Sequence, residues 1–125
     1  MKIAITSTAP TLDAAMDPRF GRCSWFVFVE TDDMAIEAVE NTSGELGGGA
    51  GIQSARLIAQ KGAKAVLTGN CGPNAHQTLS AAGIDVVVDC SGTVSGAAER
   101  FKSGQLRASP APNVASHAGM GGARR

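Results

Sequence analysis

The feature that most constrains this chain is a short apolar run, Ala65-Val66-Leu67, placed between two segments of helical periodicity. The run has no polar alternation, which is typical of a strand covered on both faces. Helical segments before and after such a strand favour parallel pairing inside a sheet. The sequence therefore predicts an α/β fold built around a central parallel strand at 65–67.

The residues after this run, Thr68 to Asn74, read TGNCGPN. Their glycines allow close backbone approach, and Pro73 is preset for the first turn of a helix. The N–H groups at the start of that helix have no partners within it and point beyond the carboxyl end of the strand. Such donors suit an anion.

Periodicity and turn residues predict seven further elements. Strands are expected at 2–7, 24–30, 34–39 and 84–88, and helices at 52–61, 73–82 and 92–102. The second and third strands form a hairpin around Thr31-Asp32-Asp33, Gly62 ends the first helix, and Thr93 is the N-cap of the last. The pattern indicates a three-layer α/β domain with a mixed sheet of about five strands and helices on both faces.

The length of 125 residues suits one domain. We expect residues 1–106 to form the α/β domain and residues 107–125, rich in Ala, Gly, Pro and Ser, to form a flexible tail. The 11 basic and 11 acidic residues balance overall, and the domain alone carries a net charge of −3. No global field therefore favours nucleic acid or an anionic membrane, and an anion site must be built locally.

The chain contains no apolar stretch near the ~20 residues of a membrane span, and its first apolar run is too short for a signal peptide. A cytoplasmic protein is therefore expected. The three cysteines are odd in number and widely spaced, which suits reduced thiols better than a disulfide framework.

The motif order of residues 1–106 resembles that of the dinitrogenase iron-molybdenum cofactor biosynthesis family. The resemblance rests on DPRFGR at 17–22, on GGAGIQSARLIAQKGAKAVLTGNCGPNAHQTLSAAGIDV at 48–86, and on Gly92-Thr93-Val94. The family includes NifX-like proteins, the C-terminal part of NifB, and the orange proteins, and a short chain of one domain is most similar to the last group. The resemblance implies a ribonuclease-H-like sheet, a molybdenum-copper sulfide cluster or, alternatively, an iron-molybdenum-sulfur cofactor precursor, and MinD-type P-loop ATPases as partners.

A metal-sulfide cluster has its metals saturated by sulfide and bears negative charge, so Arg side chains, helix N-termini and a Gly-lined cleft suffice to hold it. The loops after the first and central strands are expected to form that cleft. The expected cofactor-binding residues are Ser7, Arg19, Phe20, Gly21, Arg22, Gly48, Gly49, Gly69, Asn70, Gly72 and His76, with Cys71 as a metal ligand.

Each of the reactive side chains also has a plainer interpretation. Arg19 and Arg22 either clamp an anion or pair with nearby aspartates as solvated loop residues. Cys71 opens a helix, where the N-terminal field lowers a thiol pKa and suits a soft metal, or it is only a small residue in a tight turn. Cys23 and Cys90 are expected to be small residues near the core.

His76 lies off the expected buried stripe of Ala75, Leu79 and Ala82. It is therefore expected to be exposed near the cleft, either as an ordinary surface histidine or as a donor to cluster sulfides. The glycines at 47–51 lack the Lys-Ser/Thr of a Walker A motif and the third glycine of GxGxxG, which disfavours a nucleotide site. They form either a hinge before a helix or a loop near the cluster.

Three functions are compatible with this pattern. The first is a non-catalytic carrier of an anionic metal-sulfide cluster. The second is a two-metal nuclease, which is disfavoured because the strands at 3–7 and 65–68 carry no paired carboxylates. The third is a regulatory interaction domain without metal.

Overall fold

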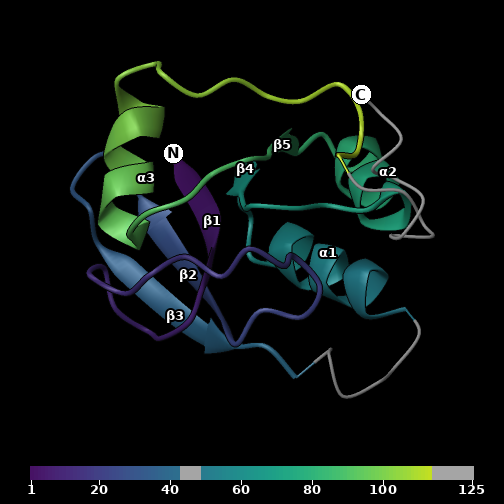
Figure 1. The fold of residues 1–125 in the computed structure, drawn as a ribbon, viewed down its shortest axis with the longest axis horizontal. Coiled ribbons are helices and arrows are strands. Elements are labelled where there is room, and N and C mark those ends of the chain that lie inside the picture. The colour runs from purple at the N-terminus through teal and green to yellow at the C-terminus, as the bar shows by residue number, and fades with distance from the viewer. Residues whose placement is uncertain (43–48, 114–125) are drawn as a thin grey trace.

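The computed structural model describes residues 1–42 and 49–113 (Figure 1). None of the helices in these ranges is long and apolar enough to cross a membrane. The elements, in chain order, are β1 (Lys2–Ser7), β2 (Trp25–Glu30), β3 (Ile36–Glu40), α1 (Ala50–Gln60), β4 (Ala65–Leu67), α2 (Pro73–Ala81), β5 (Asp85–Val87) and α3 (Val94–Lys102).

The five strands form one mixed sheet in the order β3-β2-β1-β4-β5. β1 pairs antiparallel with β2, which pairs antiparallel with β3, while β4 runs parallel to both β1 and β5. The register aligns Ile5 with Leu67 and Leu67 with Val87. The expected three-layer, ribonuclease-H-like mixed sheet is confirmed, and β4 is the buried internal parallel strand that its apolar run predicts.

Helices cover the sheet on both faces, with α1 and α2 on one side and α3 on the other (Figure 1). Side chains of β1 alternate between two hydrophobic clusters. Ala4 joins Ile58 and Leu79 under α1 and α2, whereas Ile5 joins Ala97 under α3. This double coverage explains why β4 is apolar at every position and why β1 carries three consecutive apolar residues, Ile3 to Ile5.

Six of the eight elements have bounds that differ from the expected ones by one or two residues, and the clearest differences are at the hairpin turn and the first helix. The hairpin turn extends to Ala35, because Met34 adopts a left-handed conformation with φ of 61° and its N–H donates to the Glu30 carbonyl at 2.7 Å. The first helix begins at Ala50 rather than Ile52. By contrast, the Thr93 N-cap is confirmed, since its hydroxyl accepts the Gly96 N–H at 3.0 Å.

Residues 107–113, the described part of the expected tail, lie along β5 and reach α2 (Figure 1). The Ser109 N–H donates to the Val86 carbonyl at 2.6 Å. The composition of this segment did not indicate these contacts. Residues 114–125, the rest of the expected tail, lie outside the described residues.

Candidate functional site

The loop after β1 and the turn after β4 lie side by side at the carboxyl ends of the two strands. The Asn70 N–H donates to the Pro18 carbonyl at 2.7 Å, and the Phe20 N–H donates to the Asn70 carbonyl at 3.2 Å. A Cβ added at Gly69 would lie 2.8 Å from the Pro18 Cα, closer than atoms pack. Gly69 therefore allows the two backbones to meet.

The same loop contacts the N-termini of two helices. A Cβ at Gly21 would lie 3.0 Å from the Gly51 nitrogen of α1, and a Cβ at Gly51 would lie 3.2 Å from the Ala75 Cβ of α2. The first turns of α1 and α2 are therefore neighbours, beside residues 19–22. Neither helix has a side-chain cap or an acidic residue in its first turn.

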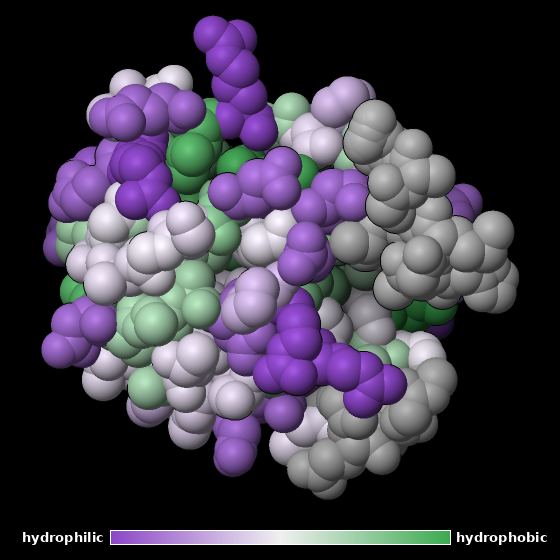
Figure 2. Space-filling model, viewed as in Figure 1, coloured by the Kyte–Doolittle hydropathy of each residue, from purple (hydrophilic) through white to green (hydrophobic). Residues whose placement is uncertain are grey.

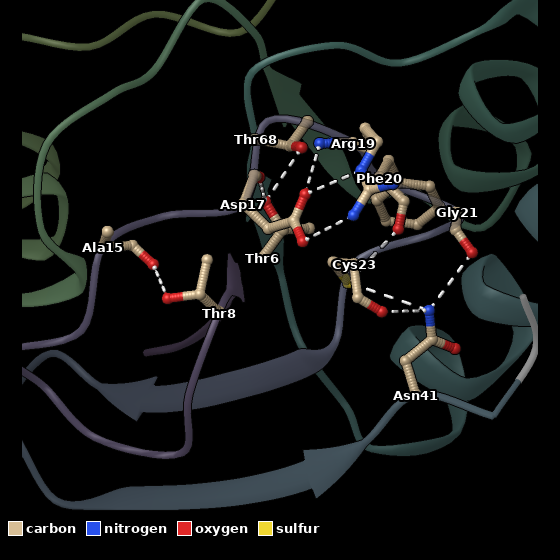
Figure 3. Close-up of polar contacts among 10 residues, drawn as sticks. All are labelled: Thr6, Thr8, Ala15, Asp17, Arg19, Phe20, Gly21, Cys23, Asn41 and Thr68. Carbon is tan, nitrogen blue, oxygen red and sulfur yellow. Dashed lines mark hydrogen bonds and ion pairs between the residues drawn. The ribbon is translucent and has the colours of Figure 1, made fainter.

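Arg19 forms an ion pair with Asp17, whose side chain is buried (Figure 3). The Arg19 Nε donates to Oδ1 at 3.2 Å and Nη2 donates to Oδ2 at 3.3 Å, and the Arg19 backbone N–H also donates to Oδ1. These hydrogen bonds raise the pKa of the guanidinium. The Arg19 side chain is nevertheless 61% exposed.

Arg22 is exposed at the surface of the same loop. The sequence left open whether the two arginines clamp an anion or pair with aspartates. For Arg19 the pairing with Asp17 is present, and it also orients the guanidinium.

Two polar residues that sequence reasoning missed hold the loop in place (Figure 3). The Thr6 hydroxyl donates to the Asp17 carbonyl at 2.6 Å and lies 3.0 Å from the Thr68 hydroxyl. The Asn41 Nδ2 donates to the carbonyls of Gly21 and Cys23 at 3.1 and 2.9 Å. The only sequence signal for Asn41 was an amide side chain two residues after the end of a predicted strand, at 34–39.

Two of the expected site residues are buried and support the loop from the protein interior. Phe20 is 2% exposed and packs against Phe26 with ring centroids 5.7 Å apart. Ser7 is fully buried, and its hydroxyl donates to the Ala9 carbonyl at 2.6 Å. Neither side chain reaches the surface at which a ligand would bind.

The expectation that Cys71 has a lowered pKa is wrong. Its side chain is 1% exposed within the hydrophobic cluster under α1 and α2, and burial raises the pKa of the thiol to about 11. Loss of solvation favours the neutral thiol and causes this rise. Burial also raises the pKa of Cys23 to about 12, and it raises that of Cys90, so both residues are core residues as expected.

The expected position of His76 is also wrong. His76 is 7% exposed, with Nε2 3.0 Å from the Ser109 carbonyl and Nδ1 3.4 Å from the Ser80 hydroxyl. Residues 107–113 cover this side of α2, which a helical pattern does not reveal. Ala82, which was expected to be buried, is the exposed C-cap residue of α2.

Two other glycines of the expected site are the N-cap residues of helices. Gly49 is the N-cap of α1, in a left-handed conformation, and Gly72 is the N-cap of α2. Asn70 is exposed in the turn before α2. Gly48 lies outside the described residues.

Asn113, which lies after α3 in the chain, contacts the turn between β4 and α2. Its Oδ1 accepts the Cys71 N–H at 2.8 Å, and its Nδ2 donates to the Gly69 carbonyl at 3.0 Å. No group of three or more His, Cys, Asp or Glu side chains that could hold a metal ion occurs within residues 1–42 and 49–113. The donors gathered here are instead N–H groups and guanidinium groups, which bind anions.

Comparison with known proteins identifies the family. The family described as dinitrogenase iron-molybdenum cofactor matches residues 1–104. An uncharacterised protein of Methanocaldococcus jannaschii is 35% identical over 109 residues, which cover 85% of this chain and 89% of the relative.

Two solved structures are similar over most of the chain. The apo form of the orange protein from Desulfovibrio gigas is 47% identical with a TM-score of 0.87, covering 90% of this chain and 95% of that one. A putative NifB protein from Thermotoga is 32% identical with a TM-score of 0.73, covering 86% and 91%. This chain therefore belongs to the dinitrogenase iron-molybdenum cofactor family.

Proposed function

We propose that the protein is a non-catalytic carrier of an anionic molybdenum-containing metal-sulfide cluster of the molybdenum-copper sulfide type. The observation that carries the proposal is the meeting of the uncapped first turns of α1 and α2 beside Arg19 and Arg22. Helix N-termini and guanidinium groups both favour negative charge.

The chemistry of the donors fits a cargo whose metals already have sulfide ligands. The described residues offer N–H donors rather than a group of side chains that would coordinate a bare ion. Cys71 is 1% exposed and joins the hydrophobic core under α1 and α2, so its thiol does not reach the surface at their first turns. The cluster is therefore held without a thiolate, at the surface formed by residues 19–22 and the first turns of α1 and α2.

The identity of the cargo rests on similarity. The likeness to the orange protein favours molybdenum with copper, and the family description favours an iron-molybdenum cofactor precursor as the alternative. A role in protein interaction without metal, and MinD-type ATPases as partners, stay predictions. The three free, buried thiols agree with the expected cytoplasmic location.

The first test is metal analysis with a visible spectrum on protein purified without air or chelator. Molybdenum and copper in a fixed ratio, with sulfide-to-metal charge-transfer bands, supports the proposal. Iron with molybdenum supports the alternative cargo. A colourless protein that thiomolybdate and copper do not reconstitute contradicts both.

A second test removes the two exposed guanidinium groups. The variant carrying Arg19→Ala and Arg22→Ala is expected to take up the cluster at least about tenfold more weakly, because each charged hydrogen bond contributes more than a neutral one. Arg56→Ala, an exposed arginine further along α1, is the matched control. Unchanged uptake in the double variant, with intact thermal unfolding, would rule out these residues as the clamp.

A further inference from the structure

The segment 107–113 connects α3 to the candidate site from outside the sheet. It leaves the end of α3, passes β5 and reaches α2 (Figure 1). Ser109 forms the middle contact: its N–H donates to the Val86 carbonyl at 2.6 Å, and its carbonyl lies 3.0 Å from the His76 Nε2. The Asn113 N–H then donates to the Cys71 carbonyl at 3.2 Å.

The Asn113 side chain occupies the turn between β4 and α2. Its Oδ1 accepts the Cys71 N–H at 2.8 Å. Its Nδ2 donates to the Gly69 carbonyl at 3.0 Å and lies 3.2 Å from the Asn70 Oδ1 and 3.4 Å from the Asp89 Oδ1. An amide oxygen therefore takes a backbone donor that an anion at the start of α2 would use.

No residue of this segment is buried. Ser109 is its only half-buried residue, and the other six are exposed. The side-chain hydrogen bonds that join it to the rest of the protein are part-buried or exposed and none is fully buried, so it can detach without unfolding the core. Pro110 and Pro112 fix two φ angles and reduce the entropy that the segment loses when it docks.

We propose that residues 107–113 are a strap that competes with the anionic cargo for the turn between β4 and α2, so that cargo binding requires Asn113 to leave. The inference rests on the proposed carrier function. While the strap is docked, the Asn113 Oδ1 takes the Cys71 N–H and places a partial negative charge where the anion would bind. Release of the strap returns this donor to the site.

The test compares wild type with Asn113→Ala by two measurements. The first is hydrogen exchange of the Cys71 amide, which reports the contact without any cargo. The second is the affinity for the tetrathiomolybdate dianion, measured by its visible absorption. Loss of a hydrogen bond corresponds to roughly a threefold to tenfold change in an equilibrium constant, so we expect exchange to quicken and binding to tighten by about that factor.

Gln105→Ala is the control, because Gln105 is an exposed amide residue whose side chain bonds only to Ser103 among the described residues. It should change neither measurement. Unchanged exchange at Cys71 in Asn113→Ala would overturn the strap. Quicker exchange at Cys71 together with equal or weaker affinity of Asn113→Ala for tetrathiomolybdate would also overturn the strap. In both cases, binding of tetrathiomolybdate by the wild-type protein would leave the carrier function supported. Absence of binding by both proteins would overturn the strap and the carrier function together.

Discussion

The helices on the two faces of the sheet start in different ways. On one face, the Thr93 hydroxyl caps α3, and Arg100 and Lys102 lie in its last turn, where they complement the helix dipole. On the other face, α1 and α2 start at Gly49 and Gly72 with no side-chain cap and no acidic residue in the first turn. The first face satisfies its own polar groups, whereas the second leaves N–H donors for another partner.

The visible face of the molecule carries few strongly hydrophobic residues. In the view of Figure 2, strongly hydrophobic residues show only in small separate areas among hydrophilic and neutral ones. The α3 face is capped within the protein, whereas the uncapped starts of α1 and α2 are where we propose that the cargo binds.

The largest expected effect concerns the thiols under α1 and α2 at high pH. Their pKa values, about 12 for Cys23 and about 11 for Cys71, lie above the ordinary 9.0, because burial favours the neutral form. The resulting stability is fully present below about pH 9 and is lost as pH rises through 11 to 12. We expect the free energy of unfolding to fall by roughly 3–5 kcal/mol between about pH 9 and 11, as measured with urea. A variant with Cys23→Ala and Cys71→Ala should lose less, and an equal loss would contradict the assignment.

The next effect compares a glycine at the site with one on the α3 face. Gly69→Ala forces a Cβ to within 2.8 Å of the Pro18 backbone and should cost about 2–3 kcal/mol in urea unfolding. Gly96→Ala meets only the ends of the Thr93 and Arg100 side chains, at 3.0 and 3.3 Å, and gains helix propensity. Its stability should stay within about 1 kcal/mol of wild type. Equal losses of unfolding free energy in the two variants would contradict the steric requirement for glycine at position 69.

A smaller effect tests the capped face directly. Thr93→Ala removes the acceptor of the Gly96 N–H and should cost about 1 kcal/mol. Thermal unfolding measures the loss, and Thr93→Ser, which keeps the hydroxyl, should restore most of it. A Thr93→Ala variant as stable as the wild type would contradict the difference between the capped and uncapped faces.

The smallest expected effect on stability is a gain that should be accompanied by weaker cluster uptake. Asn74→Asp places a carboxylate in the exposed first turn of α2 without changing side-chain size. The helix dipole should raise stability by about 0.3–1 kcal/mol. The same charge should repel the cluster and weaken its uptake. Increased stability with undiminished uptake would place the cargo elsewhere.

The fold could be predicted because local patterns determine it. The apolar run at 65–67, the glycine after α1 and the threonine before α3 each act within a few residues of the chain. The Pro73 turn likewise located the start of α2. The hairpin turn and the start of α1 were misplaced, and the left-handed Met34 in the turn gives no clear sequence signal.

The site was less predictable, because its contacts join distant parts of the chain. Cys71 and Asn113 are 42 residues apart, and Asn41 reaches back 20 residues to Gly21. Whether a thiol in a turn faces solvent or the core also depends on tertiary packing, which is why the pKa of Cys71 was wrongly expected to be low. His76 was misjudged for the same reason, since Ser109 covers it from another segment.

The most direct test of the carrier site is a titration of isotope-labelled protein with tetrathiomolybdate and copper, followed by amide NMR. If the cluster binds where the two helices start, the amide signals of residues 19–22, of Gly51 and Ile52, and of Asn74 and Ala75 shift together, while those of α3 do not. Shifts confined to other surfaces, or none at saturating cluster, would contradict the account.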